Sequence, residues 1–397
     1  MDTLEQQLDT LRARAAEVIP ADGLREKLAL GRGLRVKLGL DPTAEHVTLG
    51  WAVVLRKLRA FQDLGHTAVL IVGDFTARIG DPSEQNKTRP MLSKEQVDAH
   101  VERVLGQFQL VLSGERLEIR RNSEWLEGLG TEGLLKLGSL QTVAQTLQRD
   151  DFAKRFDAGA PITVREFLYP LLQGYDSVAV SADVEIGGTD QTFNLLVGRD
   201  VQRAYGQPPQ AVLTMPLLEG TDGEKKMSQS LGNYIALTEE PDDMFGKLMR
   251  VPDALMRKYF ELCTDLDDES IAGIVDGAVR PEVAKRRLAA TVVELYHGQA
   301  DAAATAERFD RLFVEHRMPE DVDLHPIPDD CVDGEGVFLP KLLKSIGLAP
   351  STTEARRLIA QGGVKVDGQT VATEHVATDE VRGHVIQVGK RHFARLR

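Results

Sequence analysis

Three polar side chains in the segment FLYPLLQGYDS are spaced so that a helix would bring them together. Tyr169 and Gln173 are four residues apart, and Asp176 follows three residues later. Residues at these spacings share one face of an α-helix, so the segment predicts a phenol, an amide and a carboxylate side by side. Core packing with satisfied hydroxyls is the alternative explanation for the tyrosines, and for Tyr175 it is the one we favour.

A glycine turn follows a few residues later, in the segment IGGTDQ. Gly187 and Gly188 give the turn, and Asp190 and Gln191 come directly after it. A carboxylate and an amide can hydrogen-bond to hydroxyl groups. The segment is therefore suited to binding a ribose.

The segment DPTAEHVTLGW, residues 41 to 51, lies between the apolar run LRVKLGL and the amphipathic run AVVLRKLRAFQDLG. A loop between a strand and a helix presents free backbone N–H groups and the positive end of the helix dipole to a phosphate. Thr43 and Thr48 could add hydroxyl donors, and Gly50 allows close backbone approach. Thr48 could instead simply cap the helix, as threonine commonly does.

A second candidate phosphate site is the segment GTDGEKKMSQS, residues 220 to 230, which follows the apolar run AVLTMPLLEG. Its glycines predict a flexible turn, and Lys225, Lys226 and Ser228 follow the turn. A mobile loop with lysines can neutralise the charge that develops on a leaving pyrophosphate. An ordinary solvated basic loop is the alternative.

These segments need a sheet to bring them together, and the sequence predicts one. Two apolar strands separated by one helix, between about residues 34 and 81, indicate a parallel, right-handed βαβ unit. Ligands collect at the carboxyl ends of the strands in such sheets. Asp41, Asp74 and Asp81 all fall at those ends.

The rest of the chain divides by pattern into further parts. Residues 1 to 32 have helical spacing, and the α/β pattern stops near Asn233. The expected parts are a Rossmann-like catalytic domain of residues 1–235 with a helical insertion at about 90–161, an α-helical domain of residues 236–318, a Pro- and Asp-rich linker of residues 319–334, and a small α+β domain of residues 335–397. The fold class is therefore α/β, with a parallel sheet, followed by two smaller domains.

Composition limits the classes of protein to consider. The chain has 397 residues and a net charge of −13, which argues against one uniformly basic nucleic-acid surface. The final segment, 335–397, has a net charge of about +4 and is the expected polyanion-binding part. Two distant cysteines, Cys263 and Cys331, together with the absence of an apolar leader or an 18-residue apolar run, predict a cytoplasmic protein without a zinc site.

The order of the two phosphate-type loops resembles class I aminoacyl-tRNA synthetases, and the chain as a whole resembles bacterial tyrosyl-tRNA synthetases. The resemblance rests on the segments KLGLDPT, IGDPS, KTRP, NSEWL, GGTDQ and EKKMSQS, on the pattern Tyr-x-x-x-Gln-x-Tyr-Asp of residues 169–176, and on the C-terminal tail. It implies activation of tyrosine with ATP and Mg²⁺, transfer to tyrosine tRNA, and a homodimer.

The resemblance also implies a role for each matching residue. Asp176, with the region near Lys37, should face the tyrosine hydroxyl, and Tyr169, Gln173 and Asp81 should hold the ammonium group. The resemblance further implies Gly39, Asp41 and Asp190 for ATP, Gln191 for the ribose and the tyrosine pocket, and Arg89, Lys225 and Lys226 for catalysis on the pyrophosphate. Apart from the resemblance, the further candidates are Gly50, Trp51, Gly188 and Ser228 for ATP binding, and Thr43 and Thr48 for catalysis on the phosphates.

The tail FLPKLLKSIGLAPSTTEARRLIAQGGVKVDGQTV resembles an S4-type RNA-binding module. The pattern predicts a helix, a Ser or Thr cap, a second helix that ends at Gly362-Gly363, and a strand. Lys344, Arg356, Arg357 and Lys365 are placed to contact phosphates, which position RNA without reading its sequence. A helix with an ordinary solvated basic face is the alternative.

The sequence departs from the family pattern at three places. Thr48 and Trp51 replace the histidines of a His-x-Gly-His signature, Gln229 replaces a lysine, and the loop after Asp81 carries Glu84 and Gln85 where small or basic residues are common. His46 lies two positions too early to be a substitute. Losing one donor typically costs about 10²- to 10³-fold in rate. A weakened or inhibitor-resistant paralogue that binds tyrosine or RNA, or a plain RNA-binding protein, therefore stays an alternative.

Overall fold

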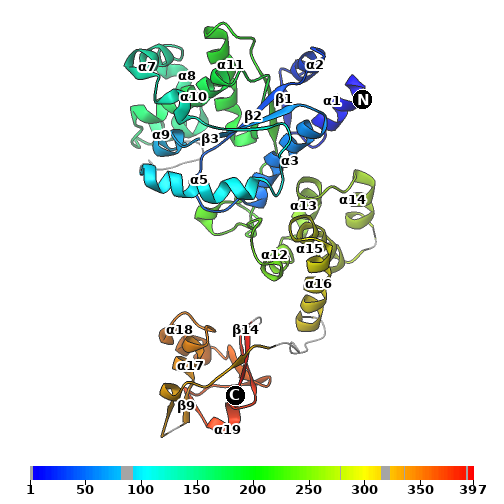
Figure 1. Cartoon of the computed structure of the whole chain (residues 1–397), viewed down its shortest axis with the longest axis vertical. Helices are drawn as coiled ribbons and strands as arrows, with labels where there is room; N and C mark the ends of the chain where they lie inside the picture. The colour runs from blue at the N-terminus through cyan, green and yellow to red at the C-terminus, as the bar shows by residue number, and fades with distance from the viewer. Residues whose placement is uncertain (1–2, 82–92, 278, 314–321, 335, 390–391) are drawn as a thin grey trace. The chain divides into compact units, whose positions relative to one another are not determined.

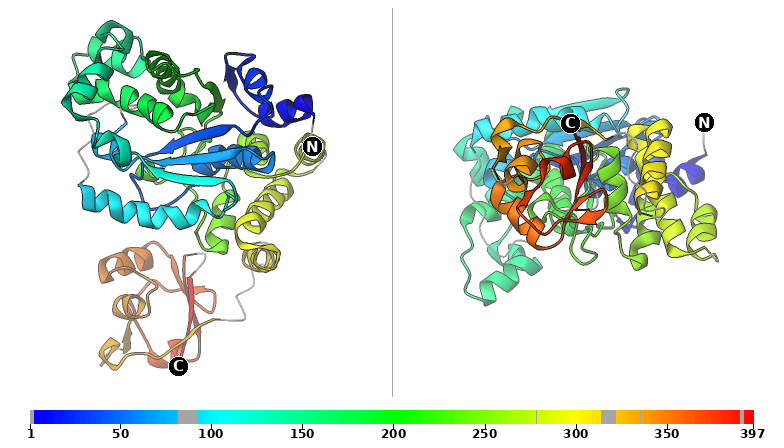
Figure 2. Two further views of the ribbon diagram at one scale, coloured as in Figure 1. Left: turned by 45° about the horizontal axis from the view of Figure 1, so that its top comes forward. Right: turned by 90° about the horizontal axis from the view of Figure 1, so that it is seen from below.

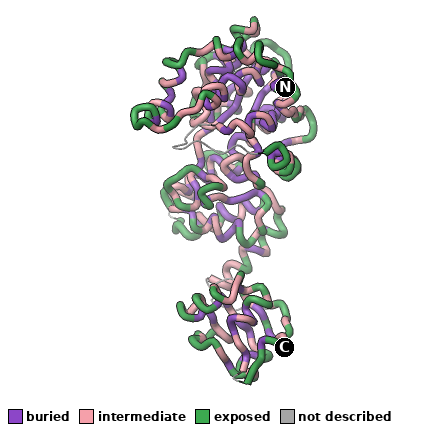
Figure 3. The backbone as a smooth tube through the Cα atoms, turned by 90° about the vertical axis from the view of Figure 1, so that its left-hand side faces the viewer, coloured by how far each residue is buried: buried purple, intermediate pink, exposed green. Residues whose placement is uncertain are grey.

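A computed structural model describes residues 3–81, 93–277, 279–313, 322–334, 336–389 and 392–397. The chain divides into two compact units, Met1–Ala302 and Ala303–Arg397, and Figure 1 shows the elements of each. Buried residues lie in the interior of each unit, with exposed residues around them (Figure 3). No helix within these described ranges is long and apolar enough to cross a membrane.

The first unit is built on a six-stranded sheet with the order β1-β6-β5-β2-β3-β4. Its strands are β1 (Glu17–Ile19), β2 (Arg35–Leu40), β3 (Thr67–Val72), β4 (Leu117–Arg121), β5 (Val184–Gly188) and β6 (Ala211–Met215). All neighbours pair in parallel except β1, which pairs antiparallel with β6. Strand β3, TAVLIV, is almost wholly buried, as expected for a parallel strand covered on both faces.

Helices cover both faces of this sheet. Figure 2 shows the strands as a central layer, with the cyan helix α5 (Lys94–Phe108) on one side and the green helices α10 (Val164–Ala179) and α11 (Thr192–Ala204) on the other. The chain runs outward from β2 through α3 (Leu49–Asp63) to β3, whereas β5 leads through α11 to β6 in the opposite direction. The strand order therefore reverses between β2 and β5, and open α/β sheets bind ligands at such a switch point.

Helix α10 carries the predicted Tyr-x-x-x-Gln-x-Tyr-Asp pattern. It begins after Thr163, which forms a reciprocal capping box with Glu166. Leu171 and Leu172 pack it into an apolar cluster with Val197 and Val201 of α11. Burial of this apolar side fixes the rotation of the helix and so turns its polar residues toward the sheet.

The remaining helices of the first unit lie around this core or after it. Before α10 they are α1 (Leu4–Arg12), α2 (Gly23–Leu28), α4 (Thr76–Ile79), α6 (Ser123–Leu126), α7 (Gly130–Gly138), α8 (Val143–Thr146) and α9 (Asp150–Asp157). After β6 they are α12 (Pro241–Leu248), α13 (Met256–Cys263), α14 (Asp268–Val275), α15 (Pro281–His297) and α16 (Gln299–Phe313), the last of which continues into the second unit. The segment expected to be an α-helical domain is therefore helical, but up to residue 302 it belongs to the same compact unit as the sheet.

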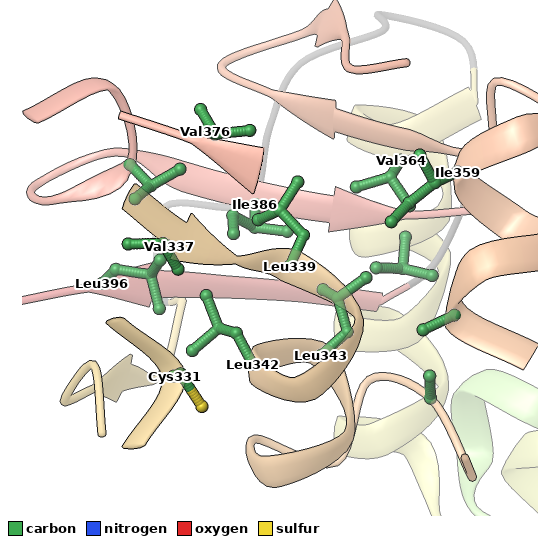
Figure 4. Close-up of a cluster of buried hydrophobic side chains, with 14 residues drawn as sticks. Cys331, Val337, Leu339, Leu342, Leu343, Ile359, Val364, Val376, Ile386 and Leu396 are labelled. Carbon is green, nitrogen blue, oxygen red and sulfur yellow. The ribbon is translucent and has the colours of Figure 1, made fainter. Parts of the chain in front are cut away.

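The second unit has its own core around a five-stranded sheet, β11-β10-β13-β14-β7, and a three-stranded sheet, β12-β9-β8. Its elements are β7 (Leu324–His325), β8 (Val332–Asp333), β9 (Gly336–Phe338), α17 (Leu339–Ser345), α18 (Thr352–Ala360), β10 (Val364–Val366), β11 (Gln369–Thr370), β12 (His375–Val376), α19 (Thr378–Val381), β13 (Val385–Val388) and β14 (His392–Leu396). Leu342 and Leu343 of α17 pack against Ile359, Ile386 and Leu396 in this core (Figure 4). The expected S4-type order is confirmed, with Ser351 capping α18.

Three expectations about local structure were wrong. The N-terminal segment is not helical throughout, because Glu17–Ile19 adds β1 to the sheet edge. The expected helical insertion contains β4, which pairs with β3. The expected linker contributes strands β7 and β8. For β1, β4 and β7, backbone pairing with a distant strand overrides the local pattern of a short segment, which sequence periodicity does not report. Strand β8 instead pairs with β9, the next strand along the chain.

Candidate active site

A cavity of about 600 Å³ lies at the carboxyl ends of β2 and β5, where the strand order reverses. It is bordered by the predicted residues Gly39, Asp41, Thr43, Thr48, Gly50, Trp51, Asp81, Tyr169, Gln173, Asp176, Gly188, Asp190, Gln191, Lys226 and Ser228. These residues come from segments up to 189 positions apart in the chain. The structure thus brings the four separate polar segments of the sequence to one site.

Gly39 leaves open space in this cavity. It lies within strand β2, where its backbone does not require glycine, and a Cβ added to it would have no atom within 4 Å. The position is also exposed, next to the buried residue Leu38. A side chain at residue 39 would therefore project into the space available to a ligand.

Asp176 is the buried carboxylate at the inner end of the cavity, with only 3% of its surface exposed. Its Oδ1 accepts a hydrogen bond from Trp125 Nε1 at 2.8 Å, and its Oδ2 accepts one from Asn122 Nδ2 at 3.3 Å. Burial raises the pKa of Asp176 to about 6, and the positive charge of Lys37 and the two donors oppose this rise. A carboxylate held in this way can accept a further hydrogen bond from a ligand hydroxyl.

Asp41 is a second carboxylate that borders the cavity. Its Oδ2 accepts from the Tyr169 hydroxyl at 2.8 Å, and its Oδ1 accepts from Thr76 Oγ1 at 2.7 Å. Burial, together with the negative charges of Asp81 and Asp176, raises the pKa of Asp41 to about 7, although the two hydrogen bonds act to lower it. The same burial, with the nearby carboxylates, raises the pKa of Tyr169 well above 10, so its hydroxyl stays protonated as a donor to Asp41.

Asp81 and Gln191 are joined across the cavity. Gln191 Nε2 donates to Asp81 Oδ2 at 2.9 Å, and Asn194 Nδ2 donates to Gln191 Oε1 at 3.1 Å. Arg149 donates in turn to the Asn194 amide oxygen at 3.1 Å. Each amide in this series of hydrogen bonds has its orientation fixed by a partner, which pre-organises Gln191 and Asp81 for a ligand.

The charges that border the cavity are mostly negative. Within the described residues its lining holds four aspartates, Asp41, Asp81, Asp176 and Asp190, and one cationic side chain, Lys226. Like charges this close in a partly dry site repel one another. The aspartate-rich part of the site is therefore suited to a ligand with a positively charged group, and the part near Lys226 to a negatively charged one.

Thr48 lies where either of the two roles that the sequence left open could be filled. It is the N-cap of α3, where its Oγ1 accepts from the Trp51 N–H at 3.3 Å, and it also borders the cavity. Trp51 and Gly50 border the cavity from the first turn of the same helix. His46 does not border it, and its ring stacks on Tyr234 with a centroid separation of 6.2 Å.

The loop with the two lysines is braced from within by Asn233. Asn233 Oδ1 accepts from the Ser228 N–H at 2.8 Å, and its Nδ2 donates to Asp222 Oδ2 at 2.9 Å and to the Lys226 carbonyl at 3.2 Å. Lys226 pairs with Asp190 at 2.5 Å across the cavity. Lys225 differs from the expectation, because it is exposed and does not border the cavity.

Lys37 is the clearest departure from the expected positions. Its side chain is fully buried under the cavity and does not border it. Its Nζ is 2.8 Å from Glu185 Oε1 and donates to the Ser177 hydroxyl at 2.8 Å and the Gln173 carbonyl at 2.9 Å. An ammonium group has only three protons to donate, so Lys37 fixes α10 to the sheet and does not meet a ligand directly.

Other expected residues are outside the described part of the chain or do not border the cavity. Arg89, Glu84 and Gln85 are outside the described residues. The backbone N–H and the hydroxyl of Ser123 donate to the carboxylate of Asp74, at 2.9 and 2.7 Å, and Asp74 does not border the cavity. Tyr175 packs edge-on against Tyr205 in an apolar cluster, as expected.

The residues that hold the carboxylates of Asp176 and Asp41 in place were not predicted from the sequence. Asn122 is fully buried, and its amide bridges Asp176 and Thr76. Trp125 and Asn122 belong to NSEWL, the segment directly after β4. The position of Asn122 at the carboxyl end of a strand was the available signal, but LEIRR was not recognised as part of the sheet.

The four predicted RNA-binding residues lie in the second unit. Lys344 is on α17, Arg356 and Arg357 are on α18, and Lys365 is on β10. Lys344 and both arginines are exposed. Arg356 pairs with Glu374 at 3.1 Å and Arg357 with Glu354 at 2.5 Å, and exposed pairs of this kind are weak enough to exchange for phosphate.

The doubly wound sheet, with its cavity at the switch point between two signature loops, is that of a class I tRNA synthetase. The family model of class I tRNA synthetases for W and Y matches residues 29–314, and the S4 domain model matches residues 339–375. A C-terminally truncated mitochondrial tyrosyl-tRNA synthetase from Aspergillus nidulans has a similar structure, with a TM-score of 0.67 and 22% sequence identity over 79% of this chain and 95% of that one.

Comparison with curated proteins narrows the class to one family. A tyrosine--tRNA ligase from Moorella thermoacetica is 48% identical over 98% of this chain and 95% of its own length. One from Thermotoga maritima is 46% identical over 99% of this chain and 98% of its own length. The chain belongs to the bacterial tyrosyl-tRNA synthetase family.

Proposed function

We infer that this chain is a tyrosine--tRNA ligase that activates tyrosine with ATP and transfers it to tyrosine tRNA. The observation that carries this function is the buried Asp176 in a cavity that Thr48 and Lys226 also border. The family relationship supports the same function over nearly the whole chain. The inner carboxylate suits a phenol, and the outer loops suit a polyphosphate.

Tyrosine would enter with its side chain toward Asp176. The phenol donates to Asp176, which Trp125 and Asn122 hold in place. The ammonium group lies among Tyr169, Gln173 and Asp81, where the nearby carboxylates neutralise its charge. Phenylalanine would leave Asp176 buried without this partner, and an unpaired buried polar group is costly.

ATP would occupy the outer part of the cavity. Gly39 and Gly188 allow close approach of the nucleotide, Asp190 and Gln191 bind the ribose, and Asp41 borders the adenylate. Gly50, Trp51 and Ser228 complete this part of the site.

Activation needs no nucleophile from the protein. The carboxylate of tyrosine attacks the α-phosphorus of ATP, forms a mixed anhydride and expels pyrophosphate. Thr43 and Thr48 donate hydrogen bonds to the phosphates, and Lys226, with Arg89 and the outlying Lys225, stabilises the charge on the leaving group. Mg²⁺ enters with ATP and is bound mainly by the phosphates, because it keeps several waters and few protein ligands.

The second unit would bind the tRNA through phosphate contacts of Lys344, Arg356, Arg357 and Lys365.

We also propose that the enzyme is a homodimer. Several large apolar side chains before and along the start of α10 are exposed, namely Leu110, Ile119, Leu135, Val143, Phe156 and Val164. A second copy of the chain that covers these side chains would remove their apolar surface from water. Sedimentation at several protein concentrations would detect the dimer.

Tyrosine-dependent exchange of pyrophosphate into ATP tests the proposed function. We expect exchange with tyrosine and much less with phenylalanine. If the chain bound tyrosine but catalysed no exchange, the proposed function would be wrong and the chain would be a tyrosine-binding protein. If the chain bound RNA but neither tyrosine nor ATP, it would be an RNA-binding protein and not an enzyme.

A further inference from the structure

Gln229 connects the two loops that border the outer cavity. Its Nε2 donates to the His46 carbonyl at 2.6 Å, and its Oε1 accepts from the His46 N–H at 3.3 Å. The two residues are 183 positions apart. One amide side chain therefore satisfies both backbone groups of a single residue on the opposite loop.

The same two chain segments also pair through their backbones. The Leu49 N–H donates to the Ile235 carbonyl at 2.9 Å, and the Leu237 N–H donates to the Val47 carbonyl at 2.8 Å. Thr48 and Ala236 form the antiparallel bridge between these bonds. Gln229 extends this pairing to His46, in the way that the peptide group of one more strand residue would.

Gln229 acts on a loop that is already braced. Asn233 binds the Ser228 N–H and the carbonyls of Lys225 and Lys226, so residues 225–228 are fixed relative to Asn233. A link at Gln229 is therefore transmitted to the segment that contains Lys226. On the other side, His46 precedes Thr48 by two residues, so the link also reaches the capping threonine of α3.

We propose that Gln229 is a positioning residue that holds the Lys226 loop against the Thr48 loop during tyrosine activation. It acts through the backbone of His46, although it borders the cavity. This role requires an amide, because an amide both donates and accepts, whereas a lysine ammonium only donates and a carboxylate only accepts. The proposal rests on the proposed function and gives the unusual glutamine in EKKMSQS a purpose that a lysine could not serve.

The test compares Gln229→Ala, Gln229→Lys and Gln229→Glu with the full-length enzyme. Two measurements are made on each, pyrophosphate exchange and the rate of trypsin cleavage after Lys225 and Lys226, located by mass spectrometry. We expect Gln229→Ala, which loses both neutral hydrogen bonds, to be cleaved there on the order of tenfold faster. Gln229→Lys and Gln229→Glu can each keep one of the two bonds, so their cleavage should also be faster than that of the unaltered enzyme, by a smaller factor. Exchange should fall by a similar factor in kcat, with the KM for tyrosine unchanged.

The control is Glu224→Gln, an exposed residue of the same loop that does not border the cavity, whose exchange rate should match that of the unaltered enzyme. Exchange by Gln229→Lys at or above the unaltered rate would overturn the proposal and assign residue 229 to the phosphates. Slower exchange with unchanged cleavage, or faster cleavage with unchanged exchange, would overturn it as well. If the unaltered enzyme lacked exchange, the proposed function would fall while the cleavage data still reported on the link.

Discussion

The hydroxyl of Tyr169 donates a 2.8 Å hydrogen bond to Asp41 Oδ2, although the two residues are 128 positions apart. Since the proton points to Asp41, the lone pairs of the phenol oxygen remain free to accept from a ligand. An ionised Asp41 behind this oxygen also makes it a better acceptor for a cation. The pair therefore turns a tyrosine into part of an ammonium site, with Asp41 acting partly through Tyr169.

The first prediction concerns the pH dependence of tyrosine use. The pKa of Asp41 is raised to about 7 in the free enzyme, so the negative charge that favours the ammonium group is lost as pH falls through 7. We expect kcat/KM for tyrosine in pyrophosphate exchange to decline below about pH 7. Asp41→Asn should have a lower kcat/KM for tyrosine, and this kcat/KM should no longer decline below pH 7. If the decline persisted unchanged in this variant, another group would be the one that titrates.

The second prediction concerns stability. The pKa values of Asp41 and Asp176 are raised above the usual 3.8 in the folded chain, so protonation favours the folded state, and this contribution is lost as pH rises from about 4 to about 7. For Asp176 the rise to about 6 corresponds to roughly 3 kcal/mol. The free energy of unfolding of Asp176→Asn, compared with that of the unaltered chain at the same pH, should therefore be larger at pH 8 than at pH 5. Urea denaturation at both pH values measures this difference. Equal changes at both pH values would contradict this explanation.

The third prediction concerns selection of the amino acid. Asp176→Asn should slow exchange with tyrosine about 10²-fold, because hydrogen bonds to a charged group contribute roughly 1.5–3 kcal/mol. Exchange with phenylalanine should change much less, so the ratio between the two substrates should shrink. Tyr175→Phe is the matched control on the same helix, because Tyr175 packs in the apolar cluster away from the cavity.

The fourth prediction separates the two roles of Thr48. Thr48→Ala removes the cap of α3 and should cost about 1 kcal/mol of stability. It should also slow exchange about 10²-fold if the hydroxyl donates to a phosphate, whereas Thr48→Ser should keep most of both properties. A loss of stability in Thr48→Ala without any loss of rate would leave Thr48 as a cap alone.

The fifth prediction concerns the second unit. Changing Arg356 and Arg357 together to alanine should weaken tRNA binding and reduce its salt dependence, since each lost phosphate contact makes the slope of log K against log salt less steep by roughly 0.7 to 0.9. Tyrosine-dependent exchange without tRNA should not change. Arg382→Ala, which removes an exposed charge elsewhere in this unit, should have a smaller effect, and an equal effect would indicate general charge attraction only.

The polar residues of the cavity could be named in advance because short segments carried their own geometry. Tyr169, Gln173 and Asp176 needed only a helical period to fall on one face, and Thr48 needed only its place before an amphipathic run. The S4-type order was similarly local, since a cap, a glycine stop and a strand are set by neighbouring residues. These features depend on interactions within a few positions of the chain.

The tertiary structure decided which residues meet, and there the sequence was least informative. Lys37 was expected at the tyrosine hydroxyl, but pairing with Glu185, from a strand 148 positions later, buries it under the site. Asn122 and Trp125 were given no role, because β4 is recognised as a strand only through its pairing with β3. The chemistry of each side chain is thus a property of the sequence. Burial, partner and pKa are properties of the packing, because they depend on contacts that no local pattern encodes.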